Sequence, residues 1–425
     1  MKLLVFAHTP PPHHGQSYMV QLMLNGFGGD RRKRSNRRPE ANPLGIECYH
    51  VNARLSRTLE NIGEIQSSKP FLILFYCLQA IWCRFRYGVE NFYYVPAPGK
   101  PIALYRDWLV MLLCRPFFKN VILHWHAAGL AKWLETAVQI RSRAATYRLF
   151  KPVDLSIVLS RFNFTDAEKL LSRRIRIVDN GIPDPCPDFA TTVRPRRQAR
   201  FIARGKLLAG EKPDAREIAD AGGDPQMVKV LFLAHCSHDK GLFATVEAVL
   251  TANRQLAAQG SAVRMKLAIG GSFVSAVEKA EFDRLIQARE YAETVEYLGF
   301  VSGPEKKRVL IETDIFCFPT CYFGENQPVN LIEAMAFGLP IVTTRWRSLP
   351  EMLPPDYPGL IDSQSPEQVA AALLKLMSER SGEAVRENFL ARFTVERHLE
   401  NLARAMRSVE TPADDASGIV PRPQH

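Results

Sequence analysis

The stretch that decides the fold runs DIFCFPTCYFGENQPVNLIEAMAFGLPIVTTRWRSLP, from Asp314 to Pro350. An apolar run is followed by a polar loop, by a segment with helical spacing that ends at Gly338, and by a second apolar run that starts at Pro340. This order of strand, loop, helix and strand is the repeating unit of a parallel α/β sheet. Ligands of such sheets bind beyond the carboxyl ends of the strands, where the next helix offers unpaired N–H groups to an anion.

Two glutamates of this stretch lie eight positions apart. Glu325 is in the polar loop, and we expect Glu333 about two turns into the helix. Because eight residues are close to a whole number of turns, the two carboxylates face a similar side and can contact two parts of one ligand. The alternative is that both glutamates only cap and solvate the helix.

A lysine upstream is a candidate for the same site. VLFLAHCSHDKG, residues 230–241, predicts a strand and a following helix, with Lys240 at the turn between them. An ammonium group at this turn can neutralise a leaving diphosphate. His235, five residues earlier, is a second cation only if its pKa is raised. A plain helix start is the alternative for Lys240.

The alternation of strands and helices extends over the whole chain. A chain of 425 residues is too long for one hydrophobic core, and its length predicts two domains of roughly 150 to 200 residues each. Expected strands are 2–7, 46–51, 92–95, 121–124, 155–159 and 175–178 in the first half, and 228–233, 265–269, 295–297, 315–318 and 340–343 in the second. This pattern predicts an α/β protein with two doubly wound parallel sheets.

The expected domain boundaries follow from composition. We expect a Rossmann-like N-terminal domain over residues 1–185 and a second one over residues 227–392. Between them, residues 186–226 are basic and rich in alanine and glycine, which favours an extended linker or surface insertion. Residues 393–410 are expected to form a helix that crosses back to the first domain, and residues 411–425 a disordered tail.

Charge and cysteine content limit the partners and the compartment. The net charge of +11 comes largely from two basic runs, residues 31–38 and 194–206, and favours a nucleic acid, a membrane surface or a phosphorylated substrate. The 8 cysteines show no CxxC spacing, so we expect reduced thiols and no zinc site. The apolar start of the chain covers only about five residues, too few for a signal peptide, and this favours the cytoplasm.

The longest apolar run is FLILFYCLQAIWC, residues 71–83. It is shorter than the roughly 20 residues that cross a bilayer. Together with WLVMLLC, residues 108–114, and with the arginines nearby, its composition suits either a helix at a membrane interface or a buried crossover helix.

The motif Glu-x7-Glu followed by AMAFGLPIVTT resembles the donor-site signature of glycosyltransferase family 4, retaining enzymes with the GT-B fold. The resemblance implies two Rossmann-like domains that face a central cleft, the first for the acceptor and the second for a nucleotide sugar. It further implies that Glu325 contacts hydroxyls of the transferred sugar and that Glu333 binds the ribose. The residues implied to approach the diphosphate are Gln327, Pro328, Val329 and Asn330.

The resemblance assigns further positions. His126, in HWHAAG at 124–129, is implied to reach the donor sugar, so that Glu325, His126 and Lys240 form the catalytic set. The implied donor-binding set also contains Gly15, His235 and Gly270, where His235 occupies a position that usually holds an arginine in this family. A strand-end histidine with a structural hydrogen bond is the alternative for His126. We expect no metal, since no third ligand accompanies the two histidines of this motif.

The implied activity is a retaining, metal-independent transfer of a hexose-type sugar from a UDP- or GDP-linked donor to a saccharide or lipid-linked saccharide, as in bacterial polysaccharide biosynthesis. No cofactor is expected. The expected location is the cytoplasm at the inner face of the membrane, with peripheral contact to anionic lipid and no nucleic acid. Two alternatives remain: a nucleotide-sugar epimerase or hydrolase on the same fold, and a basic protein that binds nucleic acid, although the basic runs lack interleaved aromatic residues.

Overall fold

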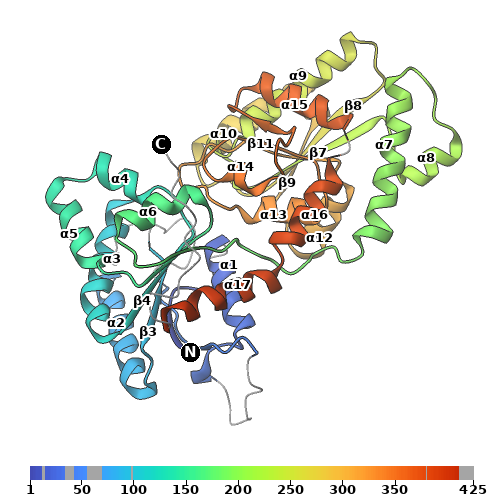
Figure 1. The fold of residues 1–425 in the computed structure, drawn as a ribbon. Coiled ribbons are helices and arrows are strands. Elements are labelled where there is room, and N and C mark those ends of the chain that lie inside the picture. Colours follow the sequence, from blue (N-terminus) through green and yellow to red (C-terminus); the bar gives the residue numbers. More distant parts are fainter. Residues whose placement is uncertain (12–14, 34–42, 55–68, 97–98, 380, 411–425) are drawn as a thin grey trace. The chain divides into compact units, whose positions relative to one another are not determined.

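The computed structural model describes residues 1–11, 15–33, 43–54, 69–96, 99–379 and 381–410 (Figure 1). The chain divides into two compact units. Unit 1 contains Met1–Val178 and the chain from Glu396 onward, and unit 2 contains Asp179–Val395. Each unit is built around its own six-stranded sheet. Within the described residues, no helix is both long and apolar enough to cross a membrane.

Unit 1 contains a parallel sheet with the strand order β2-β1-β3-β4-β5-β6. Its strands are β1 (Lys2–Phe6), β2 (Glu47–Val51), β3 (Asn91–Tyr94), β4 (Asn120–Trp125), β5 (Leu155–Val158) and β6 (Ile175–Ile177). Its helices are α1 (Gly15–Gly26), α2 (Lys69–Tyr87), α3 (Pro101–Cys114), α4 (Leu130–Ala137), α5 (Ile140–Phe150), α6 (Phe164–Lys169) and α17 (Val395–Arg407), with short 3₁₀ turns η1 (Arg31–Lys33), η2 (Arg115–Phe117), η3 (Arg161–Asn163) and η5 (Ser408–Glu410).

The two faces of this sheet carry different helices, because side chains alternate along each strand. Leu4 and Phe6 of β1 join one core cluster with residues of α2 and α3. Leu3 and Val5 join the other, with residues of α1 and α17. Figure 1 shows α1 and α17 side by side on their face of the sheet. The C-terminal helix is therefore part of the core of unit 1.

Unit 2 contains a second parallel sheet with the strand order β12-β11-β10-β7-β8-β9. Its strands are β7 (Met227–Leu233), β8 (Arg264–Gly270), β9 (Val295–Gly299), β10 (Ile315–Phe318), β11 (Ile341–Thr344) and β12 (Leu360–Ile361). Its helices are α7 (Arg194–Leu208), α8 (Ala215–Ala221), α9 (Leu242–Ala258), α10 (Ala276–Leu285), α11 (Arg289–Thr294), α12 (Gly303–Glu312), α13 (Val329–Ala336), α14 (Leu349–Met352), α15 (Pro366–Met377) and α16 (Gly382–Arg392), preceded by the π-helical turn η4 (Phe189–Val193). β7 and β10 are neighbours in the middle of this sheet.

The expected class, α/β with two doubly wound parallel sheets, is confirmed, and each expected strand has a counterpart in the structure. One strand was missed. β12 contains only two residues, Leu360 and Ile361, which is too short for a recognisable pattern. The eight cysteines are free thiols, and Cys321 is the exposed one.

The segment 186–226, expected as an extended linker or surface insertion, contains the helices α7 and α8 and is therefore not extended. Arg204 of α7 is buried and donates to Asp314 Oδ2 at 3.1 Å. α8 begins with a capping box formed by Asp214 and Glu217. Local capping and a buried ion pair thus give this basic segment regular structure. The expected tail, residues 411–425, lies outside the described residues.

Candidate functional site

Lys240 and Glu325 meet in unit 2 beyond the carboxyl ends of β7 and β10. Lys240 lies in the turn before α9, and Glu325 in the loop 319–328 after β10. The Lys240 ammonium donates to Glu325 Oε2 at 2.6 Å, and the hydroxyl of Thr320 donates to the same oxygen at 3.1 Å. The two charged side chains are only 14% and 9% exposed. The structure therefore brings two predicted site residues into a largely buried ion pair.

Aromatic side chains surround the ammonium of Lys240. Its Nζ lies 4.1 Å from the ring centroid of Tyr322 and 5.7 Å from that of Phe318. Cations are attracted to the faces of aromatic rings at such distances. Burial, followed by the charge of Glu325, raises the pKa of Tyr322. The lysine is thus held in one place by a carboxylate and by ring faces.

The turn after Lys240 requires a glycine. Gly241 has φ +86°, in the left-handed region, and a Cβ there would lie 2.5 Å from the carbonyl oxygen of Pro319. The turn before α9 therefore presses directly against the loop after β10. This contact fixes Lys240 relative to the loop that holds Glu325.

His235 follows β7 and is influenced by the charge of Lys240. Burial, and then the nearby charge of Lys240, lower the pKa of its imidazole. A lowered pKa disfavours the second positive charge that the sequence suggested at this position, whereas Lys240 is a cation.

Glu333 pairs with a lysine that the sequence analysis missed. Lys306 of α12 donates to Glu333 Oε1 at 2.5 Å, and the two side chains are 30% and 17% exposed. Glu333 lies one turn into α13 and not two, because Pro328 is the N-cap and the helix begins only at Val329. The prediction of its depth was wrong, whereas its place on the helix is as expected.

The loop between the two glutamates is fixed by a network of hydrogen bonds. The side-chain amide of Gln327 donates to Asp179 Oδ1 at 2.6 Å, and its carbonyl oxygen accepts from the backbone N–H of Asn180 at 2.8 Å. Arg392 also donates to the Asp179 carboxylate, at 3.1 Å and 3.2 Å. The backbone carbonyl of Gln327 also accepts from the side chain of Asn180, at 3.1 Å, so Gln327 is held inside unit 2 through its side chain and its backbone.

Asn330 and Gly270 also have structural contacts. The side chain of Asn330 donates to the carbonyl of Leu233, the last residue of β7, at 2.7 Å. Gly270 ends β8, and the next residue, Gly271, has φ +148° and lies so close to Ala234 that a Cβ would be 1.8 Å from its carbonyl oxygen. These contacts hold the loops after β7 and β8 together.

The predicted histidines lie in unit 1, at the end of β4. Nδ1 of His124 lies 2.7 Å from the hydroxyl of Tyr93, and the rings of His124 and His126 are 4.2 Å apart. Burial, then the charges of His126 and His398, place the pKa of His124 well below 6.5, so this ring is neutral. Among the described residues, no group of three or more His, Cys, Asp or Glu side chains could hold a metal ion.

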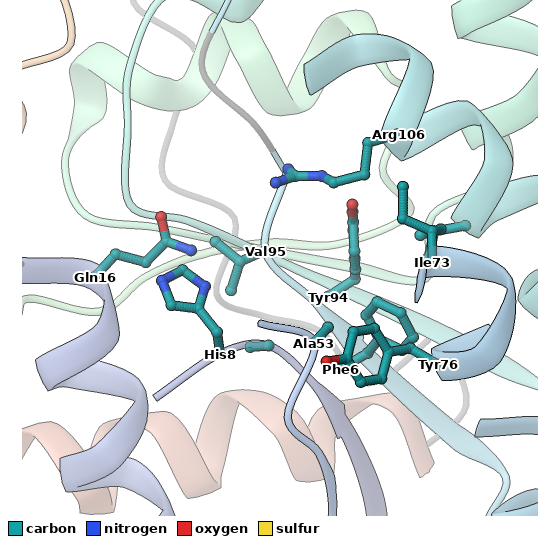
Figure 2. A pocket seen from close by; sticks show the side chains of 11 residues that line it. Phe6, His8, Gln16, Ala53, Ile73, Tyr76, Tyr94, Val95 and Arg106 are labelled. Atoms are coloured by element: carbon teal, nitrogen blue, oxygen red, sulfur yellow. The ribbon is translucent and has the colours of Figure 1, made fainter. Parts of the chain in front are cut away.

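A pocket in unit 1 opens at the carboxyl ends of β1 and β3 (Figure 2). Figure 2 shows Arg106 above Tyr94, with His8 and Gln16 on another side of the pocket. Arg106 Nη2 donates to Asp107 Oδ1 at 2.8 Å, and Tyr94 donates to the same oxygen at 2.5 Å. The residues that line the pocket are Phe6, Ala7, His8, Gln16, Ala53, Ile73, Tyr76, Tyr94, Val95, Arg106 and Val110.

The positive charge in this pocket belongs to Arg106, which is held in place by the buried side chains of Asp107 and Tyr94. Burial lowers the pKa of Arg106, but Tyr94 and Asp107 outweigh this effect and raise it overall, so the guanidinium stays charged. Gly15, predicted for the donor site, is the first residue of α1 and precedes Gln16 of the pocket. Residues 12–14 of the same predicted loop lie outside the described residues.

Comparisons with known families and proteins give one family match. Residues 215–410 match the family described as Glycosyl transferases group 1. The amylovoran biosynthesis glycosyltransferase AmsK of Erwinia amylovora is 29% identical over 175 residues, which are 40% of this chain and 41% of AmsK. The putative colanic acid biosynthesis glycosyltransferase WcaL of Escherichia coli K12 is 28% identical over 156 residues, 36% of either chain. The chain thus matches well under half the length of these curated relatives.

Several solved structures resemble nearly the whole chain. A glycosyltransferase from Rickettsia africae has a TM-score of 0.62 at 12% identity and covers 96% of this chain and 99% of its own. HepE of Anabaena, in complex with UDP and glucose, has a TM-score of 0.60 at 14% identity and covers 95% of this chain and 99% of its own. A sucrose-phosphate synthase from Thermosynechococcus elongatus has a TM-score of 0.62 at 17% identity and covers 96% of this chain and 99% of its own. At such identities these structures show the fold alone, and the expected GT-B fold class is confirmed.

Proposed function

We propose that this protein is a nucleotide-sugar-dependent glycosyltransferase of polysaccharide biosynthesis, since residues 215–410 carry a domain of the Glycosyl transferases group 1 family. The observation that carries the proposal is the buried pair of Lys240 and Glu325 at the carboxyl ends of β7 and β10. Ligands of parallel α/β sheets bind at such a place. The names of AmsK and WcaL support a role in building a polysaccharide.

The donor in this proposal is a UDP- or GDP-linked hexose that binds over the loop 325–330. Glu333, oriented by Lys306, accepts hydrogen bonds from the ribose hydroxyls, and backbone N–H groups at the start of α13 face the diphosphate. Lys240 exchanges its contact with Glu325 for the diphosphate. Glu325 then has a free oxygen for the sugar hydroxyls.

The proposed reaction retains the configuration at the sugar carbon. The bond from this carbon to the diphosphate breaks, the acceptor hydroxyl attacks from the same face, and the departing phosphate takes the proton of that hydroxyl. Lys240 stabilises the charge that develops on the leaving diphosphate. His235 is proposed to add a hydrogen bond, and His126 is proposed to contact the donor sugar. The mechanism uses no metal ion and no cofactor.

The acceptor is proposed to be a saccharide or a lipid-linked saccharide, used in the cytoplasm at the inner face of the membrane. Nucleic acid does not belong to this proposal. In the basic run 194–206, Arg197 donates to the carbonyls of Leu310 and Gly338, and Arg200 and Arg204 pair with Asp314. These guanidinium groups are used within unit 2 and do not form a surface for phosphates.

Nucleotide binding and turnover test the proposal. A screen by thermal shift with UDP, GDP and their sugars should find a ligand that stabilises the protein by about 2.7 kcal/mol at 100 times its Kd. Lys240→Ala and Glu325→Ala should each lower turnover by about two to three orders of magnitude. Lys375→Ala, which removes an exposed lysine paired with Glu379, is the matched control and should leave turnover unchanged.

Two results would contradict the proposal. Near-normal transfer by both Lys240→Ala and Glu325→Ala would remove these residues from the reaction. An epimer or a free sugar formed from the donor alone, at the rate of the full reaction and without dependence on an acceptor, would assign the site to an epimerase or hydrolase. The product is identified by nuclear magnetic resonance of the released sugar.

A further inference from the structure

Helix α2 of unit 1 buries one face and exposes another that is equally apolar. Ile73, Cys77, Ala80 and Cys83 are buried against the sheet. The opposite face carries large apolar side chains that are between 42% and 75% exposed, namely Phe71, Leu74, Phe75, Leu78, Trp82 and Phe85. Their spacing of three or four residues places them in one row along the helix, here called the α2 row. A single exposed apolar residue is ordinary, but a continuous row of six is not.

The neighbouring elements extend this row into a surface. α3 packs beside α2 on the same face of the sheet and exposes Ile102, Tyr105 and Leu112. At the other end, the ring of Phe117 in η2 lies edge-on to that of Phe85, with centroids 6.0 Å apart. The α2 row, these three residues of α3 and Phe117 are called the apolar face. The apolar face therefore consists of many neighbouring side chains, all from elements that cover one face of the sheet of unit 1.

The charges around the apolar face are positive. α2 contains no acidic residue and ends with Arg84 and Arg86 in its last turn. The carboxylate of α3, Asp107, is buried and bonded to Arg106 and Tyr94. Arg84 pairs with Glu90 at 3.7 Å and donates to the carbonyl of Phe117 at 2.8 Å, so Arg86 is the exposed cation in the last turn of α2. The apolar face therefore fits a partner that is apolar within and negatively charged at its surface.

We propose that the apolar face docks unit 1 onto an anionic phospholipid bilayer, with α2 lying in the plane of the interface. A bilayer supplies both the hydrocarbon for the α2 row and the negative headgroups for Arg86. A second copy of the chain fits less well, because a symmetric contact would bring the same cations together. α2 is not apolar enough to span the membrane, so it lies at the surface.

The docked helix also connects the membrane to the pocket of unit 1. Ile73 and Tyr76 of α2 line this pocket, and Phe75 lies between them in sequence on the exposed side. An acceptor with a polar head in the pocket can therefore keep an apolar chain beside the α2 row. This identification of the acceptor as a membrane lipid rests on the proposed function, whereas the docking itself does not.

Vesicle flotation of the full chain tests the docking. The protein should float with vesicles of phosphatidylglycerol and to a much smaller extent with vesicles of phosphatidylcholine. Phe71→Ser, Phe75→Ser and Leu78→Ser together should weaken the partition by about tenfold for each side chain. Val274→Ser with Val277→Ser, at similarly exposed positions of unit 2, is the control and should float like the wild type. Arg86→Gln should reduce the preference for phosphatidylglycerol.

The outcomes separate docking from catalysis. The proposal is overturned if the triple variant floats like the wild type, if the wild type ignores phosphatidylglycerol, or if light scattering shows a dimer that the triple substitution separates. Nucleotide binding by thermal shift is measured on the same samples and should be equal in the wild type and the triple variant. Loss of flotation with intact nucleotide binding supports docking. Flotation by a wild type that binds no nucleotide would overturn the transferase proposal and leave docking intact.

Discussion

Lys240→Met should destabilise unit 2 by about 3 kcal/mol, the lower end of the cost of removing one partner from a buried ion pair. Methionine keeps the apolar contact with Tyr322 and Phe318 but leaves the carboxylate of Glu325 without its cation. That carboxylate is 9% exposed and then retains the hydrogen bond from Thr320. For a domain of this size, the loss corresponds to a fall in Tm of about 6 to 12 °C.

Glu325→Gln should cost less, about 1 to 2 kcal/mol. The amide oxygen of glutamine still accepts a hydrogen bond from Lys240, and the ammonium keeps its contact with the Tyr322 ring at 4.1 Å. The double variant Lys240→Met with Glu325→Gln contains no unpaired charge. Its stability should lie about 1 to 2 kcal/mol below the wild type, which gives a coupling energy of about 2 to 4 kcal/mol.

Differential scanning calorimetry on the four proteins measures this cycle. Lys375→Met, at an exposed lysine of the same unit, controls for the general effect of losing a cation. Additivity of the two single substitutions to within about 0.5 kcal/mol would refute the claim that the pair is buried and coupled. The same result would remove the argument that the donor must break this pair in order to bind.

Three further predictions concern other parts of the molecule. Lys306→Met should raise the KM for the donor by about tenfold and leave kcat unchanged, since one charge-assisted hydrogen bond to Glu333 is lost. Lys306→Arg should keep this hydrogen bond and a KM close to that of the wild type. Gly271→Ala should lower the Tm by far more than Gly299→Ala. A Cβ at position 271 would lie 1.8 Å from a carbonyl oxygen, whereas the space around position 299 is open. An equal fall in Tm for the two variants would contradict the contact at Gly271. His124 has a lowered pKa in the folded state, so its contribution to stability is present above about pH 6.5 and lost as the pH falls. Urea unfolding at two pH values, one above and one below 6.5, measures this effect. The free energy of unfolding should fall less with pH in His124→Gln than in the wild type.

The strands could be predicted because their signal is local. The apolar runs at 228–233 and 315–318, for example, correspond to β7 and β10. Arginine and alanine are good helix formers, and the basic segment at 194–206 forms a helix that the prediction did not include. The ion pair of this segment with Asp314 could not be predicted because Asp314 is far away in sequence. Composition showed the charges of this segment, but not that three of its guanidinium groups turn inward.

The candidate site could be predicted in part. Glu325 and Lys240 were recognised separately, but their contact depends on β7 and β10 being neighbours, which is a property of sheet topology. Lys306 was missed because nothing in its own helix distinguishes it from the lysine beside it. The direction in which the pKa of His235 shifts depends on its surroundings in the fold, which the sequence does not show.

The discontinuity of unit 1 has a consequence for the order of synthesis on the ribosome. Leu402 and Met406 of α17 complete the core that contains Val20 and Met23 of α1. All of unit 2 is translated between these two helices, and roughly 200 residues take on the order of 10 to 40 s at the usual rate of elongation. During this interval the nascent α1 lacks its permanent neighbour. Unit 2, which is continuous in sequence, can therefore fold first, and a chaperone that shields α1 would act in this window.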